Sequence, residues 1–119
     1  MEKYTFLQYP ACGTCRKARK WLEENQVAFN NRLIVEQNPT REELMTWIPK
    51  SGLPLKKFFN TSGVLYKEMN LKDRLATMSE SEQIDLLASN GKLVKRPLMV
   101  SDDSVLVGFK EEEWANTLK

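Results

Sequence analysis

The sequence contains no histidine and only two cysteines, Cys12 and Cys15, among its 119 residues. A structural zinc site normally takes four Cys or His ligands, so carboxylates or a second chain would have to complete a metal centre here. Thiols are normally kept reduced inside cells. If the protein is intracellular, two cysteines so close together therefore indicate chemistry or metal binding rather than a structural disulfide.

The chain also lacks a strong excess of one charge and lacks long apolar runs. Its 18 Lys and Arg against 16 Asp and Glu give a net charge of +2, which is too balanced to indicate a nucleic-acid-binding protein. No stretch approaches the roughly 20 apolar residues of a membrane helix. The first residues, MEKYTFLQYPACG, do not have the pattern of a signal peptide. We therefore expect a soluble, cytoplasmic, single-domain protein (1–119) with no membrane and no direct nucleic-acid contact.

Apolar spacing and turn residues predict a chain in which strands and helices alternate. The expected segments are a strand at 3–9, a helix at 13–26, a strand at 27–36, a helix at 38–52, short turns at 53–71, a helix at 79–91, a hairpin at 97–109 and a helix at 110–119. Capping boxes mark two helix starts, Thr40 with Glu43 and Ser79 with Glu82. A helical crossover joins parallel strands and a tight hairpin joins antiparallel ones, so the pattern predicts an α/β fold with a four-stranded mixed sheet.

Both cysteines lie at the expected start of the helix at 13–26, in the spacing C-x-x-C. They could be small core residues or metal ligands, but this spacing after a strand favours a thioredoxin-like redox pair. Free N–H groups at a helix start stabilise a thiolate, so Cys12 is the expected nucleophile and Cys15, one turn inside, the resolving cysteine. The small residues Gly13 and Thr14 leave Cys12 accessible.

Arg96 and Pro97 form a second candidate feature, because they immediately precede the predicted hairpin. An arginine can hold an anion with two parallel hydrogen bonds, and an X–Pro bond can be cis. The alternative interpretation is a solvated arginine next to a proline that opens a strand and needs no hydrogen-bonding partner.

The order of these motifs resembles the ArsC/Spx family of thioredoxin-fold proteins, which includes glutaredoxin-linked arsenate reductases and Spx-type transcriptional regulators. The segments that carry the resemblance are YPACGTCRKARKWLEE, NPTREELMTWIPKSG, KRPLMV and VGFKEEEW. The resemblance implies a thioredoxin-like fold with a helical insert at about 38–91, and a cis Pro97 facing Cys12. It also implies that Arg96 binds an oxyanion.

Three functions follow from the residues and the resemblance. The first is a thiol–disulfide oxidoreductase that needs no cofactor and is reduced by an external thiol such as glutathione, glutaredoxin or thioredoxin. Its substrate would contact Gly13, Thr14, Arg96 and Pro97. The second is a redox-sensing regulator that binds the C-terminal domain of the RNA polymerase α subunit, where Gly52 corresponds to a contact glycine.

The third function is a glutaredoxin- or glutathione-dependent arsenate reductase. Such enzymes place two further arginines around the anion, and this chain departs from that pattern. Asn60 stands where the first is expected, and no arginine follows Arg96, so Lys110 is the one cation near the last strand. A lysine lacks the fork geometry of arginine.

Overall fold

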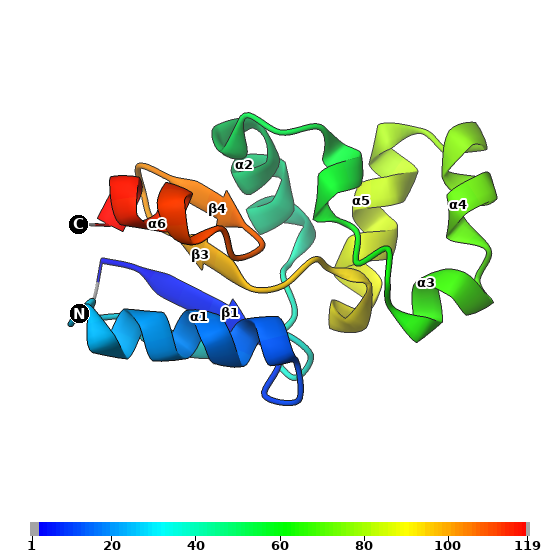
Figure 1. The fold of residues 1–119 in the computed structure, drawn as a ribbon. Helices are drawn as coiled ribbons and strands as arrows, with labels where there is room; N and C mark the ends of the chain where they lie inside the picture. The colour runs from blue at the N-terminus through cyan, green and yellow to red at the C-terminus, as the bar shows by residue number, and fades with distance from the viewer. Residues whose placement is uncertain (1–2, 119) are drawn as a thin grey trace.

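A mixed four-stranded sheet with the order β2-β1-β3-β4 lies at the centre of the computed structural model, which describes residues 3–118 (Figure 1). The strands are β1 (Thr5–Gln8), β2 (Asn30–Leu33), β3 (Leu98–Val100) and β4 (Val105–Val107). β1 pairs with β2 in parallel and with β3 in antiparallel orientation, and β3 and β4 form the hairpin. This is the sheet of a thioredoxin-like fold, as predicted.

The helices follow the predicted order, and the middle of the chain is almost entirely helical. The α-helices are α1 (Gly13–Glu24), α2 (Arg41–Ser51), α3 (Val64–Glu68), α4 (Leu71–Arg74), α5 (Glu80–Ser89) and α6 (Glu111–Leu118). Short 3-10 turns are η1 (Leu55–Phe58), η2 (Leu75–Thr77) and η3 (Gly91–Leu93). Figure 1 shows α3, α4 and α5 grouped beyond one end of the sheet. Among the described residues, no helix has the length and apolar character needed to cross a membrane.

The predicted helix starts are confirmed, but the strands are shorter than predicted. Both capping boxes form, at Thr40 and at Ser79. The strand expected at 27–36 is confirmed only at Asn30–Leu33, because this edge strand pairs with β1 alone and β1 offers four residues.

Side chains of β1 alternate between two hydrophobic clusters, one on each face of the sheet. Phe6 packs with Trp21 of α1 and Trp114 of α6, and its ring lies edge-on to that of Trp114 at 6.2 Å. Leu7 joins the larger cluster, which α2 and the middle helices complete. Both faces of the sheet are therefore covered, and β1, the inner strand that leads into α1, is held between the two clusters.

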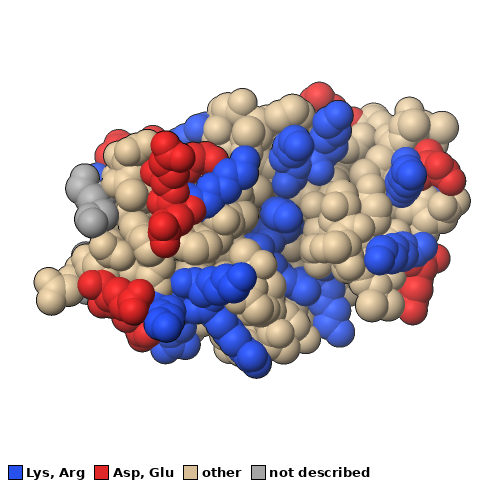
Figure 2. Space-filling view, in the orientation of Figure 1, with Lys and Arg blue, Asp and Glu red and all other residues tan. Residues whose placement is uncertain are grey.

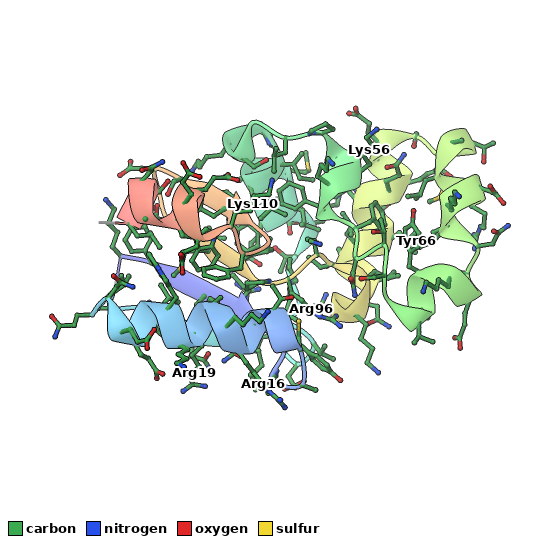
Figure 3. The ribbon with its side chains drawn as sticks, viewed as in Figure 1. Arg16, Arg19, Lys56, Tyr66, Arg96 and Lys110 are labelled. Carbon is green, nitrogen blue, oxygen red and sulfur yellow. The ribbon has the colours of Figure 1, made fainter. Side chains whose placement is uncertain are left out.

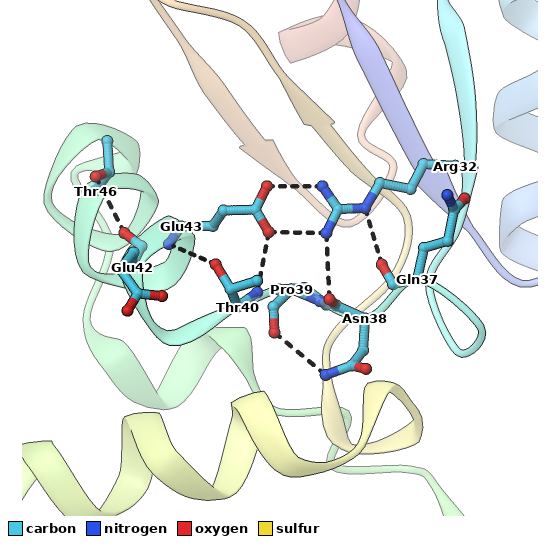
Figure 4. A network of polar contacts seen from close by, with 8 residues as sticks. All are labelled: Arg32, Gln37, Asn38, Pro39, Thr40, Glu42, Glu43 and Thr46. Atoms are coloured by element: carbon cyan, nitrogen blue, oxygen red, sulfur yellow. Dashed lines mark hydrogen bonds and ion pairs between the residues drawn. The ribbon is translucent and has the colours of Figure 1, made fainter.

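An arginine–glutamate pair connects β2 to the start of α2 (Figure 4). Arg32 donates two hydrogen bonds to the Glu43 carboxylate, at 2.7 and 2.8 Å, and Glu43 also accepts the Thr40 N–H. The Arg32 hydrogen bonds are the main reason that the pKa of Glu43 lies below its usual value of 4.5. The pair thus fixes the start of α2, where the helical middle of the chain begins, relative to β2.

Gly91 lies close against the backbone that follows β2. A Cβ atom added to this residue would lie 1.9 Å from the carbonyl oxygen of Ile34, which follows β2. A rigid backbone atom cannot move aside as a flexible side chain can, so only glycine fits here.

We expect Gly91→Ala to lower the free energy of unfolding by about 3 kcal/mol, because the two backbones must separate. Urea unfolding followed by tryptophan fluorescence measures the change. Gly13→Ala is the matched control, since an added Cβ at Gly13 meets nothing within 4 Å. A Gly91→Ala protein as stable as the wild type would contradict the close approach.

Candidate functional site

The turn between β1 and α1 places Cys12 directly before the helix. The Cys12 N–H donates to the Tyr9 carbonyl at 2.9 Å, and the Cys12 carbonyl accepts the Arg16 N–H at 3.1 Å. Cys12 has extended backbone angles and is the N-cap residue of α1. Gly13 and Thr14, which follow, are exposed. The predicted position of Cys12, just outside the helix, is confirmed.

The two sulfurs have different surroundings. Cys12 is half-buried, whereas Cys15 is completely buried in the first turn of α1, and both are free thiols. The Tyr9 N–H donates a hydrogen bond to the Cys15 sulfur at 3.4 Å. One sulfur is therefore within reach of a reactant, and the other is held behind it by the end of β1.

Local hydrogen bonds favour the thiolate of Cys12. Its partial burial raises the pKa, but several hydrogen-bond donors together outweigh that effect. The donors are the Cys15 N–H, the Cys15 thiol, the Thr14 N–H and the Arg96 guanidinium. The net result is a Cys12 pKa below the ordinary 9.0, which is the condition for a cysteine to act as a nucleophile near neutral pH.

Burial has the opposite result at Cys15. Loss of water around this sulfur raises its pKa to about 12, although the Tyr9 N–H acts in the other direction. The neighbouring Cys12 adds to the increase, through its hydrogen bond and through its charge. The pair therefore holds one ionisable sulfur and one protonated sulfur.

Arg96 reaches the site from the segment before β3. Its guanidinium lies over the Tyr9 ring, 4.5 Å from the centroid, and it donates to the Lys92 carbonyl at 3.5 Å. Figure 3 shows Arg96 near the first turn of α1. The Arg96–Pro97 peptide bond is cis, as the resemblance implied, whereas contact of Pro97 with a substrate stays a prediction.

A pocket of about 210 Å³ lies next to Arg96 and is lined also by Tyr9, Asn60 and Lys92. Asn60 is therefore close to Arg96, as its correspondence to an arginine position implied. Lys110 instead forms an ion pair with Glu113 at 3.5 Å. Sequence reasoning missed Tyr9 and Lys92, and no spacing pattern marks either residue. The described residues contain no group of three or more His, Cys, Asp or Glu side chains that could hold a metal ion.

The sheet, the cysteine pair at the start of α1 and the cis proline before β3 define a thioredoxin-fold protein with two thiols at one site. The model of the ArsC family matches residues 7–117, and the chain therefore belongs to that family. This confirms the resemblance found in the sequence.

Known proteins agree with this membership. The chain is 58% identical to the uncharacterised protein YusI of Bacillus subtilis over 110 residues, 92% of this chain and 93% of YusI. It is 31% identical to the regulatory protein MgsR of the same organism over 112 residues, 94% of this chain and 87% of MgsR. A crystal structure of an ArsC-family-related protein from Bacteroides fragilis is 68% identical, with a TM-score of 0.96 and 98% of each chain covered.

We expect iodoacetamide to modify native Cys12 and to spare Cys15 at neutral pH. Cys12 has the lowered pKa and partial exposure, whereas Cys15 is buried with a pKa of about 12. The difference in rate should be roughly 30-fold or more, even after allowing for the greater nucleophilicity of the more basic thiolate. The Cys12 rate should rise with pH and level off with a midpoint below 9.0. Peptide mapping by mass spectrometry measures both, and equal labelling of the two cysteines would contradict this assignment.

We expect Arg96→Gln to raise the Cys12 pKa and to slow its alkylation at pH 7 by roughly threefold or more. The reason is the loss of the guanidinium hydrogen bond to the Cys12 sulfur. Arg16→Gln is the matched control, because Arg16 donates to the Pro10 carbonyl and is not among the groups that lower this pKa. Identical pH–rate profiles for the wild type and Arg96→Gln would show that Arg96 does not lower the pKa of Cys12.

Proposed function

We propose that the protein is a thiol–disulfide oxidoreductase in which Cys12 is the nucleophile and Cys15 the resolving cysteine. The observation that carries this proposal is the contrast between the two sulfurs. Cys12 is partly exposed and has a lowered pKa, while Cys15, one helical turn away, is buried with a raised pKa. A structural pair of core cysteines would not need this difference.

The reaction takes two displacement steps. The Cys12 thiolate attacks one sulfur of a substrate disulfide, and the other substrate sulfur leaves as a thiolate and takes up a proton. Cys15 then loses its proton and attacks the Cys12 sulfur, which releases the second substrate thiol. The substrate disulfide is reduced to two thiols, and the two cysteines are oxidised to one disulfide.

The attack by Cys15 becomes electrostatically favourable only after Cys12 has formed the mixed disulfide. The charge of Cys12 contributes to the raised pKa of Cys15. When the Cys12 sulfur is bound in a mixed disulfide, that charge is gone and Cys15 ionises more readily. The Tyr9 N–H, which already points at the Cys15 sulfur, stabilises the thiolate that forms.

An external thiol completes the cycle by reducing the Cys12–Cys15 disulfide. We propose that glutathione, glutaredoxin or thioredoxin supplies this thiol and that no bound cofactor takes part. Arg96 and the exposed Gly13 and Thr14 surround Cys12 on the substrate side.

We expect Cys15→Ser to accumulate a mixed disulfide at Cys12 when treated with bis(2-hydroxyethyl) disulfide, because no second sulfur is present to resolve it. The wild type should instead lose two hydrogens and carry no adduct, and dithiothreitol should reverse both changes. Intact-protein mass spectrometry distinguishes the products, with Cys12→Ser as the control that forms neither. A wild-type protein that never forms the internal disulfide would exclude the dithiol mechanism.

A second candidate function is redox-dependent regulation, which the 31% identity to the regulatory protein MgsR favours. In this case the disulfide changes the start of α1 and so a surface that binds the RNA polymerase α subunit. Gly52 does not by itself support this function, because it ends α2 with a φ of 72°, a left-handed conformation that favours glycine for structural reasons. A pull-down with the C-terminal domain of the α subunit, from reduced and oxidised protein, tests the idea, and absence of binding in both states excludes it.

Arsenate reduction is less well supported by the site. Asn60 and Lys92 accompany Arg96 in its pocket in place of further arginines, and Lys110 is paired with Glu113. Arsenate turnover with glutaredoxin or glutathione, measured for the wild type and Arg96→Ala, tests this alternative. Equal rates would show that the arginine binds no arsenate.

A further inference from the structure

Three neighbouring pockets, one of them lined by Tyr9 and Arg96, are lined by cations and by no acidic residue. The first, of about 270 Å³, is lined by Lys56, Lys57, Phe59, Thr61, Tyr66 and Lys95. The second shares Thr61 and Tyr66 with it and adds Lys67 and Lys72, and the third is the pocket of Lys92 and Arg96. We call these seven cationic residues the basic surface. In Figure 2, blue side chains gather across the middle of this face, and the red ones lie mainly towards its margins.

Within residues 3–118, the charges of the basic surface form no ion pair with an acidic side chain. The ion pairs of the described residues use Lys3, Arg19, Arg32, Arg41 and Lys110, none of which belongs to the basic surface. Lys95 is half-buried, with its side chain against Gly108. Like charges that converge on one hollow repel one another, and a bound anion relieves that repulsion. The pockets are therefore complementary to a negatively charged partner.

The backbone connects the basic surface to Cys12. Lys95 is adjacent to Arg96, whose guanidinium lies over the ring of Tyr9, the residue whose carbonyl accepts the Cys12 N–H. The Lys95 N–H donates to the Phe58 carbonyl at 2.7 Å. This hydrogen bond joins η1, whose Lys56 and Lys57 line the first pocket, to the segment before β3. Figure 3 shows Arg16, Arg96, Lys110 and Lys56 on the same face of the molecule. A partner whose sulfur reacts at Cys12 would thus extend over these pockets.

The lining of the first pocket fits a polypeptide. The half-buried ring of Tyr66 offers apolar surface beside the three ammonium groups, Thr61 adds a hydroxyl, and the buried ring of Phe59 packs 6.3 Å from that of Tyr66. Carboxylates can bind the lysines while an aliphatic stem or backbone contacts the Tyr66 ring. A nucleic acid would match the charge, but it carries no sulfur for Cys12, and the net charge of the chain is only +2.

We propose that the basic surface binds an acidic segment of the protein whose disulfide is attacked by Cys12. This inference rests on the proposed function and names its partner class, a polypeptide with Asp and Glu flanking the reactive cysteine. Cys12 attacks the partner's sulfur, the group bonded to that sulfur leaves as a thiolate, and Cys15 then releases the partner as a thiol.

The test uses peptides whose single cysteine is held as a mixed disulfide with thionitrobenzoate and is flanked by glutamates, by serines or by lysines. Stopped-flow absorbance follows thionitrobenzoate release. The glutamate peptide should react about tenfold faster than the lysine peptide at low salt, and the difference should shrink as salt screens the charges. Equal rates for the three peptides would overturn the inference. Release of thionitrobenzoate from the serine peptide would still support the proposed function, because that peptide tests the reaction of Cys12 without flanking charges.

Two variants, each with three lysines replaced by glutamine, show which lysines cause the preference for the glutamate peptide. Lys56→Gln/Lys57→Gln/Lys95→Gln should lose the preference for the glutamate peptide and keep the rate with the serine peptide. Lys17→Gln/Lys20→Gln/Lys50→Gln removes three charges away from these pockets and should keep the preference. Lys56→Gln/Lys57→Gln, which changes only exposed side chains, replaces the triple variant if that protein does not fold. A preference that survives in the Lys56/Lys57 variant and the triple variant would overturn the inference.

Binding of a peptide that contains no cysteine tests this inference separately from the proposed redox function. Fluorescence anisotropy of a labelled glutamate-rich peptide, with serine in place of cysteine, should show binding that the Lys56/Lys57/Lys95 variant weakens about tenfold. Such binding would support the basic surface even if Cys12 reacted with no disulfide. Absence of binding, or tighter binding of a single-stranded DNA of equal charge, would overturn the assignment to an acidic polypeptide.

Discussion

The hydrogen bond from the Tyr9 N–H to the Cys15 sulfur joins the end of β1 to the first turn of α1. Together with the hydrogen bond from the Cys12 N–H to the Tyr9 carbonyl, it sets the path of the turn that carries the site. Because β1 is an inner strand buried on both faces, this turn cannot shift without disturbing the core. The different burial of the two sulfurs, and hence their different pKa values, follow from that constraint.

The same strand end also determines what can approach Cys12. The Tyr9 ring supports the Arg96 guanidinium, which arrives from a segment some eighty residues later in the chain. Arg96 in turn borders the pocket of Asn60 and Lys92, and its neighbour Lys95 borders the pocket of Lys56 and Lys57. The helical middle of the chain therefore contributes to the candidate site through Asn60 and Lys92, which line the pocket beside Arg96.

Local signals in the sequence predicted a large part of the fold. Capping boxes at Thr40 and Ser79 are short-range interactions between a side chain and a backbone three residues away, so the sequence alone revealed both helix starts. The strand at 27–36 was predicted too long because strand length depends on the partner strand, which is not a local property. The position of Cys12 before the helix and of Cys15 inside it was also readable, since it follows from a helix boundary.

What the sequence by itself determined was the helix that begins after Cys12, the alternation of β1 between two cores, and the C-x-x-C pair that links the chain to its family. Only the tertiary structure decided that Tyr9 and Arg96 meet near Cys12, and that the lysines around η1 and before β3 line one pocket. The physical reason is the separation along the chain between the groups that interact. Helix caps and strand alternation depend on residues a few positions apart, whereas the field around Cys12 depends on groups that only the folded chain brings together.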